Sequence, residues 1–262
     1  MQLAIISTIH NLEYSDEGEI YLCLAHLALR NVNYMNFFIH KRREGKHVIL
    51  DNGVAEGITI NPADYIELAL KIKPAEIVLP DKLYDAAQTR YQAQHFLNFY
   101  RLTLAENNIR TIGVVQGSTL KQAKECYDYY LYHSGVHTIA LPFAGLDFFD
   151  YKAISKTQRH ALARIHFWRY IVDANPSQQL KSKPIHLLGL YNPYELKFYR
   201  DQYAVRSCDS ISPVAHGAAG IQFSMYGIAD KVSSAIHEKR LPKKAKNNIM
   251  FNINKLKEFA SE

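Results

Sequence analysis

The sequence contains few cysteines, and their placement excludes a disulfide framework. Cys23, Cys126 and Cys208 are odd in number and far apart, with no Cys-x-x-Cys pair and no Cys/His cluster at zinc-binding spacing. A small disulfide-stapled domain and a zinc finger are therefore not expected. A chain of 262 residues, of which 48% are hydrophobic, can bury a core large enough to need neither kind of support.

The sequence also lacks the long apolar runs of membrane proteins. No segment reaches the roughly 18 consecutive apolar residues of a membrane-spanning helix. The first residues, 1–7 (MQLAIIS), have neither the basic region nor the long apolar segment of a signal peptide. We therefore expect a soluble, cytoplasmic protein that contacts no membrane.

Glycine-rich nucleotide motifs are absent as well. No GxGxxG and no GxxxxGK[ST] follows a predicted strand, so neither a dinucleotide site nor a P-loop is expected. We predict no cofactor and no bound metal. The chain does have an excess of basic residues, with a net charge of +6 and a pI near 9.0, and it has 18 tyrosines. Basic charge favours a polyanionic partner, and aromatic rings can stack on bases, although most tyrosines are expected to be packing residues.

Short apolar segments alternate with amphipathic ones along most of the chain. The predicted strands are 3–7, 47–51, 76–81, 110–117, 137–143, 184–190 and 205–209. The predicted helices are 19–30, 61–73, 85–107, 119–132, 154–174 and 193–203. An eighth strand is less clear, and 220–228 is the best candidate. This alternation predicts an α/β fold, a single (β/α)8 TIM-type barrel without a zinc subdomain, with a doubly wound open sheet as the alternative.

The last part of the chain is rich in basic residues. We expect residues 1–236 to form the barrel and residues 237–262 to form a basic segment that packs on it or trails from it. Its basic residues are Lys239, Arg240, Lys243, Lys244 and Lys246, with two further lysines beyond them. A solvated basic tail is the preferred interpretation over a specific contact, because blocks of like charge are usually solvated.

Four predicted strands are followed by polar side chains: Asp51, Asp81, Gln116 and Asp209. In a barrel, the carboxyl ends of the strands meet at one mouth, where catalytic groups gather. Taken singly, each residue has a simpler explanation as a turn former, a helix N-cap or a loop residue. As a set they favour a site. Clustered carboxylates can bind magnesium through their oxygens. They can instead act as a nucleophile and an acid/base in glycosyl transfer. A carboxylate beside an amide can also form hydrogen bonds with the edge of a purine.

In this order the motifs resemble those of the tRNA-guanine transglycosylases, the queuine- and archaeosine-type base-exchange barrels. Residues 50–53 (LDNG) are similar to the family's Asp-Ser-Gly-Gly element, and residues 79–81 (LPD) fall where the family has its base-reading Asp. Residues 113–117 (GVVQG) match Gly-Ile-Val-Gln-Gly. Residues 186–190 (HLLGL) and 193–196 (PYEL) resemble Leu-Met-Gly-Val-Gly and Pro-Glu-Asp-Leu, and 208–213 (CDSISP) resembles Phe-Asp-Cys-Val-x-Pro.

The resemblance implies a role for each matched residue. It makes Asp209 the catalytic nucleophile and Asp51 the catalytic acid/base. It also implies a set of substrate-binding residues, which are Asp81, Gln116, Gly117, Phe143 and Gly189. Three histidines, His10, His186 and His216, could approach the mouth, but we leave them out of the predicted site because single histidines are more often structural.

The chain also departs from the family's pattern. Asn52 replaces a Ser, and Val54-Ala55 replace the Phe/Tyr-Gln that follows the family's glycines. Pro142 stands in the loop that corresponds to the family's base-binding Gly-Gly-Leu and has no N–H to donate, so a backbone donor must come from Phe143 or beyond. The zinc site of the tRNA enzymes is missing, and the short chain resembles the zinc-free phage and bacterial enzymes that insert 7-deazaguanines into DNA.

The resemblance therefore implies a pentosyltransferase that exchanges guanine for a preQ0-type 7-deazaguanine in DNA through a covalent Asp-glycosyl intermediate. The expected partners are DNA, in preference to tRNA, and the free base; a partner protein could also be required. The location is the host cytoplasm if the gene belongs to a phage. The alternatives are the same exchange in tRNA, a non-catalytic barrel that binds nucleic acid or a partner, and a magnesium-dependent hydrolase that uses the same carboxylates.

Overall fold

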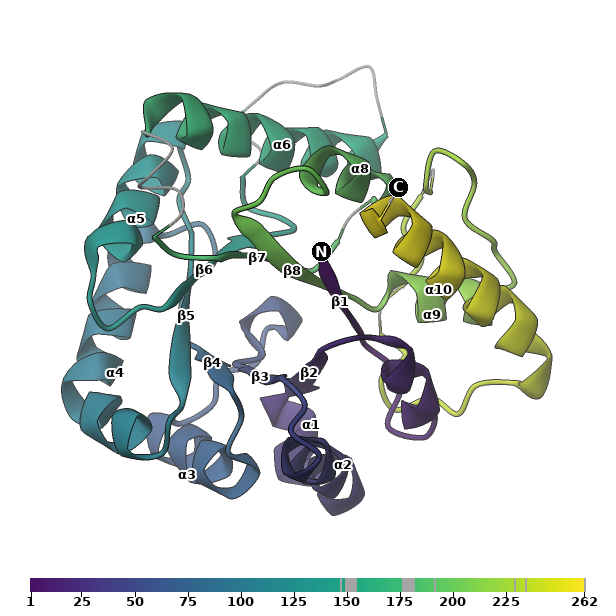
Figure 1. Cartoon of the computed structure of the whole chain (residues 1–262), viewed down its shortest axis with the longest axis horizontal. Helices are drawn as coiled ribbons and strands as arrows, with labels where there is room; N and C mark the ends of the chain where they lie inside the picture. Colours follow the sequence, from purple (N-terminus) through teal and green to yellow (C-terminus); the bar gives the residue numbers. More distant parts are fainter. Residues whose placement is uncertain are drawn as a thin grey trace.

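Eight parallel strands form one sheet that curls into a barrel (Figure 1). The computed structural model describes residues 1–146, 148, 155–175, 182–190, 192–228, 230–233 and 235–261. The order of strands in the sheet is β1-β8-β7-β6-β5-β4-β3-β2, so each strand lies beside its neighbour in sequence and the first lies beside the last. The predicted α/β class and (β/α)8 barrel are confirmed, and the doubly wound open sheet is excluded.

The strands are short and almost wholly buried. They are β1 (Gln2–Ile5), β2 (Tyr21–Leu24), β3 (Val48–Asp51), β4 (Glu76–Val78), β5 (Arg110–Val114), β6 (Thr138–Pro142), β7 (Ile185–Leu188) and β8 (Val205–Ser210). Near-continuous apolar runs such as Val48-Ile49-Leu50 are typical of parallel strands covered on both faces. The inner face is filled by side chains, and the outer face lies under the helices.

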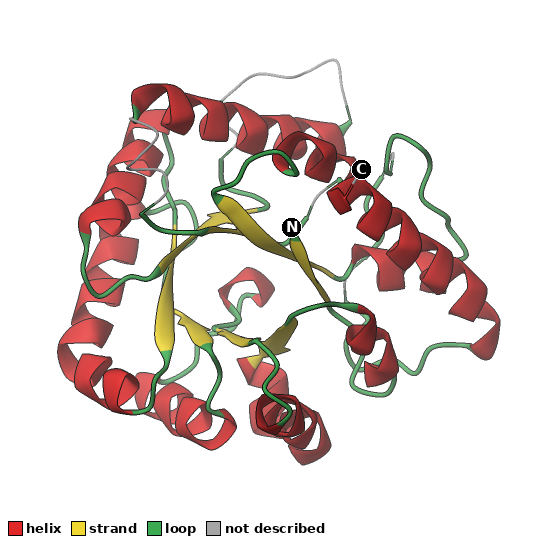
Figure 2. Cartoon of the chain, in the orientation of Figure 1, coloured by secondary structure: helices red, strands yellow, loops and turns green. Residues whose placement is uncertain are grey.

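Helices surround the barrel, as Figure 2 shows. They are α1 (Ala25–Arg30), α2 (Val32–Arg43), α3 (Pro62–Ile72), α4 (Ala86–Glu106), α5 (Leu120–Tyr132), α6 (Lys156–Ala174), α8 (Leu196–Tyr199), α9 (Ser212–Ala218) and α10 (Lys246–Ser261). The 3-10 turns are η1 (Leu12–Glu17), η2 (Val54–Glu56), η3 (Pro193–Glu195) and η4 (Lys243–Ala245). The start of α3 is as predicted, because Asn61 Oδ1 accepts from Ala63 N (2.9 Å) ahead of Pro62. Ile154, the predicted start of α6, lies outside the described residues.

The prediction for the eighth strand was wrong, and so was that for part of the first helix. Segment 220–228 holds only an isolated bridge between Ser224 and Gly227. The missing strand is β2, inside the predicted helix 19–30, of which only the second half is helical. All four residues of β2 are buried, and a short apolar run buried on every side has no periodicity that separates a strand from a helix. Pairing with β3 decides the conformation.

The barrel closes between β1 and β2 through few backbone contacts. Ala4 and Ile20 form a parallel bridge, and Glu19 N donates to Leu3 O (2.9 Å). The Glu19 carboxylate accepts from Leu3 N (2.8 Å), so a side chain satisfies a backbone donor that faces no strand. Such a group would be costly if left without a partner in the interior.

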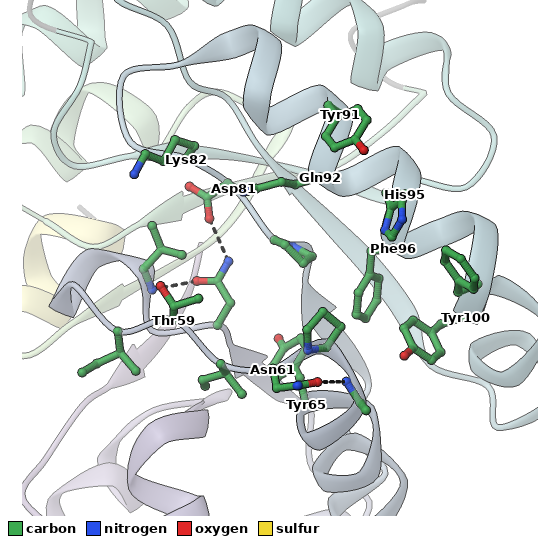
Figure 3. A pocket seen from close by; sticks show the side chains of 18 of the residues that line it. Thr59, Asn61, Tyr65, Asp81, Lys82, Tyr91, Gln92, His95, Phe96 and Tyr100 are labelled. Carbon is green, nitrogen blue, oxygen red and sulfur yellow. Dashed lines mark hydrogen bonds between the residues drawn. The ribbon is translucent and has the colours of Figure 1, made fainter.

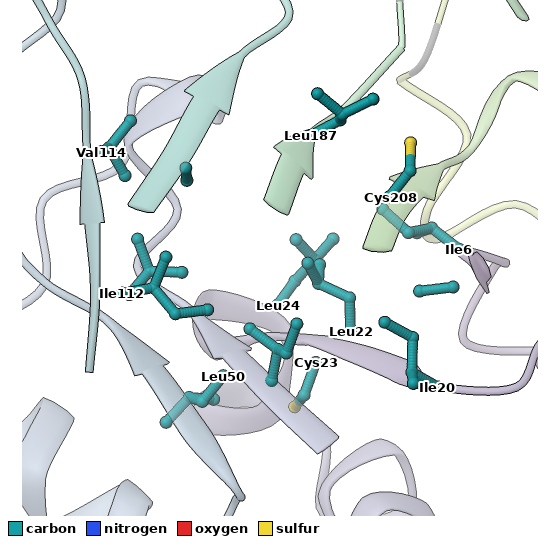
Figure 4. Packing of buried hydrophobic residues seen from close by; sticks show 14 of the residues in the cluster. Ile6, Ile20, Leu22, Cys23, Leu24, Leu50, Ile112, Val114, Leu187 and Cys208 are labelled. Carbon is teal, nitrogen blue, oxygen red and sulfur yellow. The ribbon is translucent and has the colours of Figure 1, made fainter. Parts of the chain in front are cut away.

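Aliphatic side chains fill the centre of the barrel. Figure 4 shows Leu22 and Leu24 of β2 and Ile112 of β5 pointing into the barrel, whereas Leu187 points away from it, toward the helices. All three cysteines are free and buried, and burial raises the pKa of each thiol. They therefore act as small apolar side chains.

The amino-terminal end of the barrel is closed by a buried charge cluster. Glu76 at the start of β4 accepts from Arg206 Nη2 (2.6 Å) and Thr138 Oγ1 (2.5 Å), and it contacts His47 Nε2 (2.8 Å). Burial alone raises the pKa of Glu76, but the hydrogen bonds from His47 and Arg206 outweigh it and hold the pKa well below its usual range. The carboxylate is thus ionised inside the protein, and the opposite end of the barrel is left for the polar groups at the strand ends.

The C-terminal helix α10 packs against the outside of the barrel. Its buried residues Ile249, Ile253, Leu256 and Phe259 face α9 and β1. Gly217 in α9 allows close contact, because a Cβ there would lie 2.5 Å from the Ile249 backbone. No helix in the described part of the chain is long and apolar enough to cross a lipid bilayer.

A second buried ion pair fixes the outer helices to the mouth. Arg164 of α6 donates from Nε and Nη2 to the Glu195 carboxylate (3.1 and 2.7 Å). Its Nη1 donates to Leu141 O (3.1 Å) and Gly189 O (2.8 Å), which follow or end β6 and β7. Four hydrogen bonds from one guanidinium thus join a helix, a turn and two strand ends.

We predict that Glu195→Gln lowers the free energy of unfolding by about 3–5 kcal/mol, because it leaves the Arg164 charge buried without a counter-charge. Urea denaturation followed by circular dichroism measures the change. The matched control is Glu67→Gln, which removes the exposed pair with Lys71 (2.6 Å) and should change stability little. Equal effects of the two substitutions would show that the buried pair is not a structural clamp.

Candidate functional site

The barrel places all four predicted strand-end residues at its carboxyl-terminal mouth. Asp51 ends β3, and Asp209 is the last residue but one of β8. Asp81 and Gln116 follow β4 and β5, and Gln116 Nε2 donates to Asp81 Oδ2 (2.8 Å). All four are buried. Asp209 and Asp81 also raise the pKa of Asp51, so the three carboxyl groups lie close enough to interact.

Asp209 has one oxygen held and one available. Its Oδ1 accepts from Gly189 N (2.8 Å) and lies 3.0 Å from His186 Nε2. Among the residues that the structure describes, Oδ2 has no hydrogen-bond partner. Gly189 adopts a left-handed conformation (φ +70°), and a Cβ there would lie 2.7 Å from Phe143 Cδ1. Only glycine can therefore turn this amide toward the carboxylate beside the Phe143 ring.

His186 belongs to the site, although sequence reasoning left it out. Its Nδ1 lies 2.9 Å from Ser207 Oγ. In the tautomer with its hydrogen on Nε2, His186 donates to Asp209 Oδ1 and its Nδ1 accepts from the Ser207 hydroxyl. The pairing of β7 with β8 puts His186 beside Ser207. This register, not a local motif, was the missing signal.

The three side chains are those of a serine-hydrolase triad, but their order in space is reversed. Asp209 lies at the mouth, whereas Ser207 precedes it by two positions in β8 and is deeper in the barrel. Ser207 and His186 are both 0% exposed, so no substrate reaches the hydroxyl. The hydroxyl and the imidazole therefore hold and orient the carboxylate, and the carboxylate is the group that faces the opening.

Asp51 is set up differently from Asp209. Its Oδ2 accepts from Gly53 N (2.9 Å). Burial first, then the charge of Glu56, and then Asp209 and Asp81 hold the pKa of Asp51 well above its usual range, while the Gly53 N–H works against them. The same mouth thus holds a carboxylate supplied with N–H donors and a carboxyl group that favours its proton. Two such groups can divide the roles of nucleophile and acid.

Asp81 lies between two amide side chains. In Figure 3 the hydrogen bond that reaches Asp81 comes from Asn52 Nδ2 (2.7 Å to Oδ1), and Asn52 also donates to Leu79 O (2.9 Å). Burial raises the pKa of Asp81 to about 6, against the opposing effect of the hydrogen bonds from Asn52 and Gln116. Asn52, which departs from the family's Ser, therefore links the ends of β3 and β4.

The orientation of the Gln116 amide is fixed. Its Oε1 accepts from Tyr84 N (3.0 Å) while its Nε2 donates to Asp81. An amide nitrogen has two hydrogens, so one N–H of Gln116 is left to donate to a ligand. Asp81 can accept further bonds through the remaining lone pairs of its oxygens. Asp81 and Gln116 therefore present hydrogen-bond acceptors, the Asp81 oxygens, beside a donor, the second N–H of Gln116.

The remaining predicted residues have separate roles. The ring of Phe143 packs against Gly189 and lies 4.3 Å from the Nζ of Lys231. Gly117 is explained by packing, because a Cβ there would lie 2.5 Å from Ala123 N in the first turn of α5. Nothing in its surroundings marks it as a ligand contact.

Lys231 and Glu56 are charged groups of the mouth that sequence reasoning missed. Burial lowers the pKa of Lys231 to about 8, although Asp209 and Glu56 favour its charge. Although Glu56 is exposed, partial desolvation and the charge of Asp209 raise its pKa, while Lys231 lowers it. Lys231 lies on a loop and Glu56 ends the three-residue turn η2, and neither segment is long enough to have a periodic pattern that marks it.

The carboxylates are arranged for hydrogen bonding. Within the described ranges, no three His, Cys, Asp or Glu side chains lie together in a group that could hold a metal ion. Both oxygens of Asp81 face amide N–H donors, whereas a cation needs oxygen ligands around it. This geometry suits an organic ligand with N–H groups better than the magnesium site considered from the sequence.

The sequence matches no protein-family model and no curated protein. The geometry of the mouth is therefore what bears on function.

We predict that Asn52→Ala raises the pKa of Asp81 above about 6, because the substitution removes a hydrogen bond to the charged form. Carboxyl-carbon NMR titration of aspartate-labelled protein measures the pKa. The control is Asn98→Ala, on the exposed side of α4, which should leave the titration of Asp81 unchanged. An unchanged pKa in both variants would show that Asn52 does not tune the carboxylate.

Proposed function

We propose that the chain is a pentosyltransferase that exchanges guanine in a nucleic acid for a preQ0-type 7-deazaguanine. The carrying observation is the contrast between two buried carboxyl groups at one mouth. Asp209 has one oxygen held by Gly189 N and His186 and the other available. Asp51 has a raised pKa. This is the arrangement that a carboxylate nucleophile and a proton donor need.

In the first step, Asp209 Oδ2 attacks C1′ of the target nucleotide. The new O–C1′ bond forms as the C1′–N9 bond breaks, and the electron pair of the broken bond goes to N9 of guanine. Asp51 gives its proton to the departing base. The nucleic acid is then held as a glycosyl ester of Asp209, as in retaining glycosyl transfer.

In the second step, the incoming base takes the place of guanine. Its N9–H gives a proton back to Asp51, and N9 attacks C1′ and releases the Asp209 carboxylate. Both carboxyl groups return to their starting states, so atoms and charge balance over the cycle. Two inversions at C1′ retain its configuration.

Asp81 and Gln116 are assigned to base recognition. The Asp81 oxygens accept from the N–H groups of the purine edge, and the second Nε2 hydrogen of Gln116 donates to the ring carbonyl. Guanine and a 7-deazaguanine share this edge and differ at position 7. One site therefore serves both the departing and the incoming base.

The basic C-terminal segment supports a nucleic-acid substrate. Ile9 N donates to His237 O (2.7 Å) and Leu241 N to Asn11 Oδ1 (3.0 Å), which ties the segment to the loop after β1, on the side of the mouth. Its exposed cations are Lys239, Arg240, Lys243, Lys244 and Lys246. Cations there can hold phosphates while the target base leaves the stack to enter the barrel. The preference for DNA over tRNA rests on the absence of a zinc-binding Cys/His motif from residues 1–262.

We predict that Asp209→Asn lowers base exchange by about a thousandfold or more and leaves the fold intact, because the Asn oxygen can still accept from Gly189 N. Labelled guanine or a labelled 7-deazaguanine is incubated with duplex DNA, single-stranded DNA and bulk tRNA, and the label in each polymer is counted. The control is Asp201→Asn, whose side chain is 79% exposed.

The polymer that takes up label identifies the substrate. The wild-type protein should also form a denaturation-resistant adduct with that polymer, and Asp209→Asn should form none. Full exchange by Asp209→Asn would contradict the assignment of the nucleophile. Nucleic-acid binding without exchange would favour the non-catalytic barrel, and exchange lost with a chelator would favour metal-dependent chemistry.

Guanine binding should weaken below pH about 6, the pKa of Asp81. The raised pKa means that acid protonates Asp81 there, and a protonated carboxyl group loses acceptor strength toward the purine N–H groups. Affinity should fall about tenfold per pH unit in the acid range, measured by equilibrium dialysis with labelled guanine. Asp81→Asn should bind weakly without this slope, and Asp64→Asn, on exposed α3, should keep it. A pH-independent affinity in the wild type would contradict the assignment.

A further inference from the structure

A cavity of about 630 Å³ lies beside the site, between the β3–α3 connection and α4. Asn52 and Asp81 line it, so it is continuous with the base-recognition residues. Figure 3 shows Asp81 and Lys82 near one end and the rings of α4 along one wall. The exchange reaction uses none of the rings.

The wall from α4 is aromatic and largely exposed. Tyr91, His95 and Phe99 are spaced by four residues and therefore lie on one face of the helix. The rings of Tyr91 and His95 stack at 6.0 Å, and those of His95 and Phe99 are 4.8 Å apart. Tyr91 is 64% exposed and Phe99 67% exposed. Exposed apolar surface of this kind marks a binding site more often than chance.

The opposite wall and floor complete a groove. The wall comes from the connection between η2 and α3 and includes Ile58, Ile60 and Pro62. The floor includes Phe96 and Tyr100, whose rings are 5.0 Å apart. Planar groups entering the groove are therefore met by aliphatic and aromatic side chains.

Among the described residues, one acidic and one basic side chain line the groove, Asp81 and Lys82. The helix α4 adds no acidic residue to its wall, because none occurs between Asp85 and Glu106. Lys82 lines the cavity and is exposed. Exposed rings next to cations are the combination that binds single-stranded nucleic acid, in which bases stack and phosphates are neutralised.

We propose that this groove binds the unpaired nucleotides next to the target guanine, with their bases stacked on Tyr91 and Phe99 and a phosphate near Lys82. The inference rests on the proposed function, since it takes the target base to lie at Asp81. It adds a single-stranded segment as the form of substrate recognised. It also explains how a base can stay out of its stack, because its neighbours are held on protein rings.

The test is binding, which needs no catalysis. A fluorescein-labelled single strand of about 12 nucleotides, within the range of single-strand site sizes, is titrated with protein, and fluorescence anisotropy gives the affinity. Tyr91→Ala/Phe99→Ala should bind roughly tenfold or more weakly. The control is Tyr203→Ala, which removes a 62% exposed ring just before β8, at the opposite end of the barrel. Thermal melts confirm that both variants fold.

The contribution of Lys82 to binding is measured by how the affinity for the single strand depends on salt concentration. Lys82→Gln should reduce the slope of log affinity against log salt by about 0.7, the value for one phosphate contact on a single strand. An unchanged slope would remove Lys82 from the site. Unchanged affinity in Tyr91→Ala/Phe99→Ala would overturn the proposal, and if that variant also dissociated a dimer seen by sedimentation, the groove would instead be covered by a second copy of the chain.

Failure here is distinguishable from failure of the proposed function. If Asp209→Asn binds the strand as tightly as the wild type and the ring variant does not, the groove is a nucleic-acid site whether or not exchange is detected. If exchange is detected but Tyr91→Ala/Phe99→Ala binds the strand as tightly as the wild type, the proposed function is supported and the groove proposal is contradicted.

Discussion

The structure depends on keeping three carboxyl groups buried at one barrel mouth. Each ionised carboxylate removed from water must be compensated or must take up a proton. The protein does this differently at each position: Asp209 receives two N–H donors, Asp81 receives two side-chain amides, and the pKa of Asp51 is raised. A cluster arranged only for stability would not gather like charges, because each raises the cost of ionising its neighbour. The gathering of like charges at the mouth is the feature on which the proposed chemistry rests.

The position of Asp209 depends on residues beyond those that contact it directly. The Gly189 amide can face the carboxylate because Arg164 binds the carbonyls of Gly189 and Leu141 and is itself neutralised by Glu195. Asp209 thus accepts from a peptide group whose carbonyl is held by a charged side chain that is almost wholly buried. Placement on strand ends of a packed barrel, supported from outside, is how a site keeps its geometry without ligand.

The barrel and the residues at its strand ends could be predicted from the sequence. Buried parallel strands are apolar runs, and the polar residues that follow them are easily recognised. Asp51 and Asp209 were found in that way. Residues 21–24 were misassigned because an apolar segment buried on all sides has no distinguishing period. His186 was missed because its role arises from the register of β7 against β8, and Lys231 because a loop carries no pattern. Long-range strand pairing, not local preference, decides the first two.

Asn52 connects the two parts of the molecule assigned to substrate. Its side chain donates to Asp81 and Leu79 O, and it also lines the aromatic groove. A ligand in the groove that draws the Asn52 amide away would remove one of the two hydrogen bonds that lower the pKa of Asp81. Occupation of the groove and the charge of Asp81 are then linked, because the Asn52 amide takes part in both. Where the family's pattern has the shorter Ser, a single hydroxyl lacks the second N–H that makes this bridge.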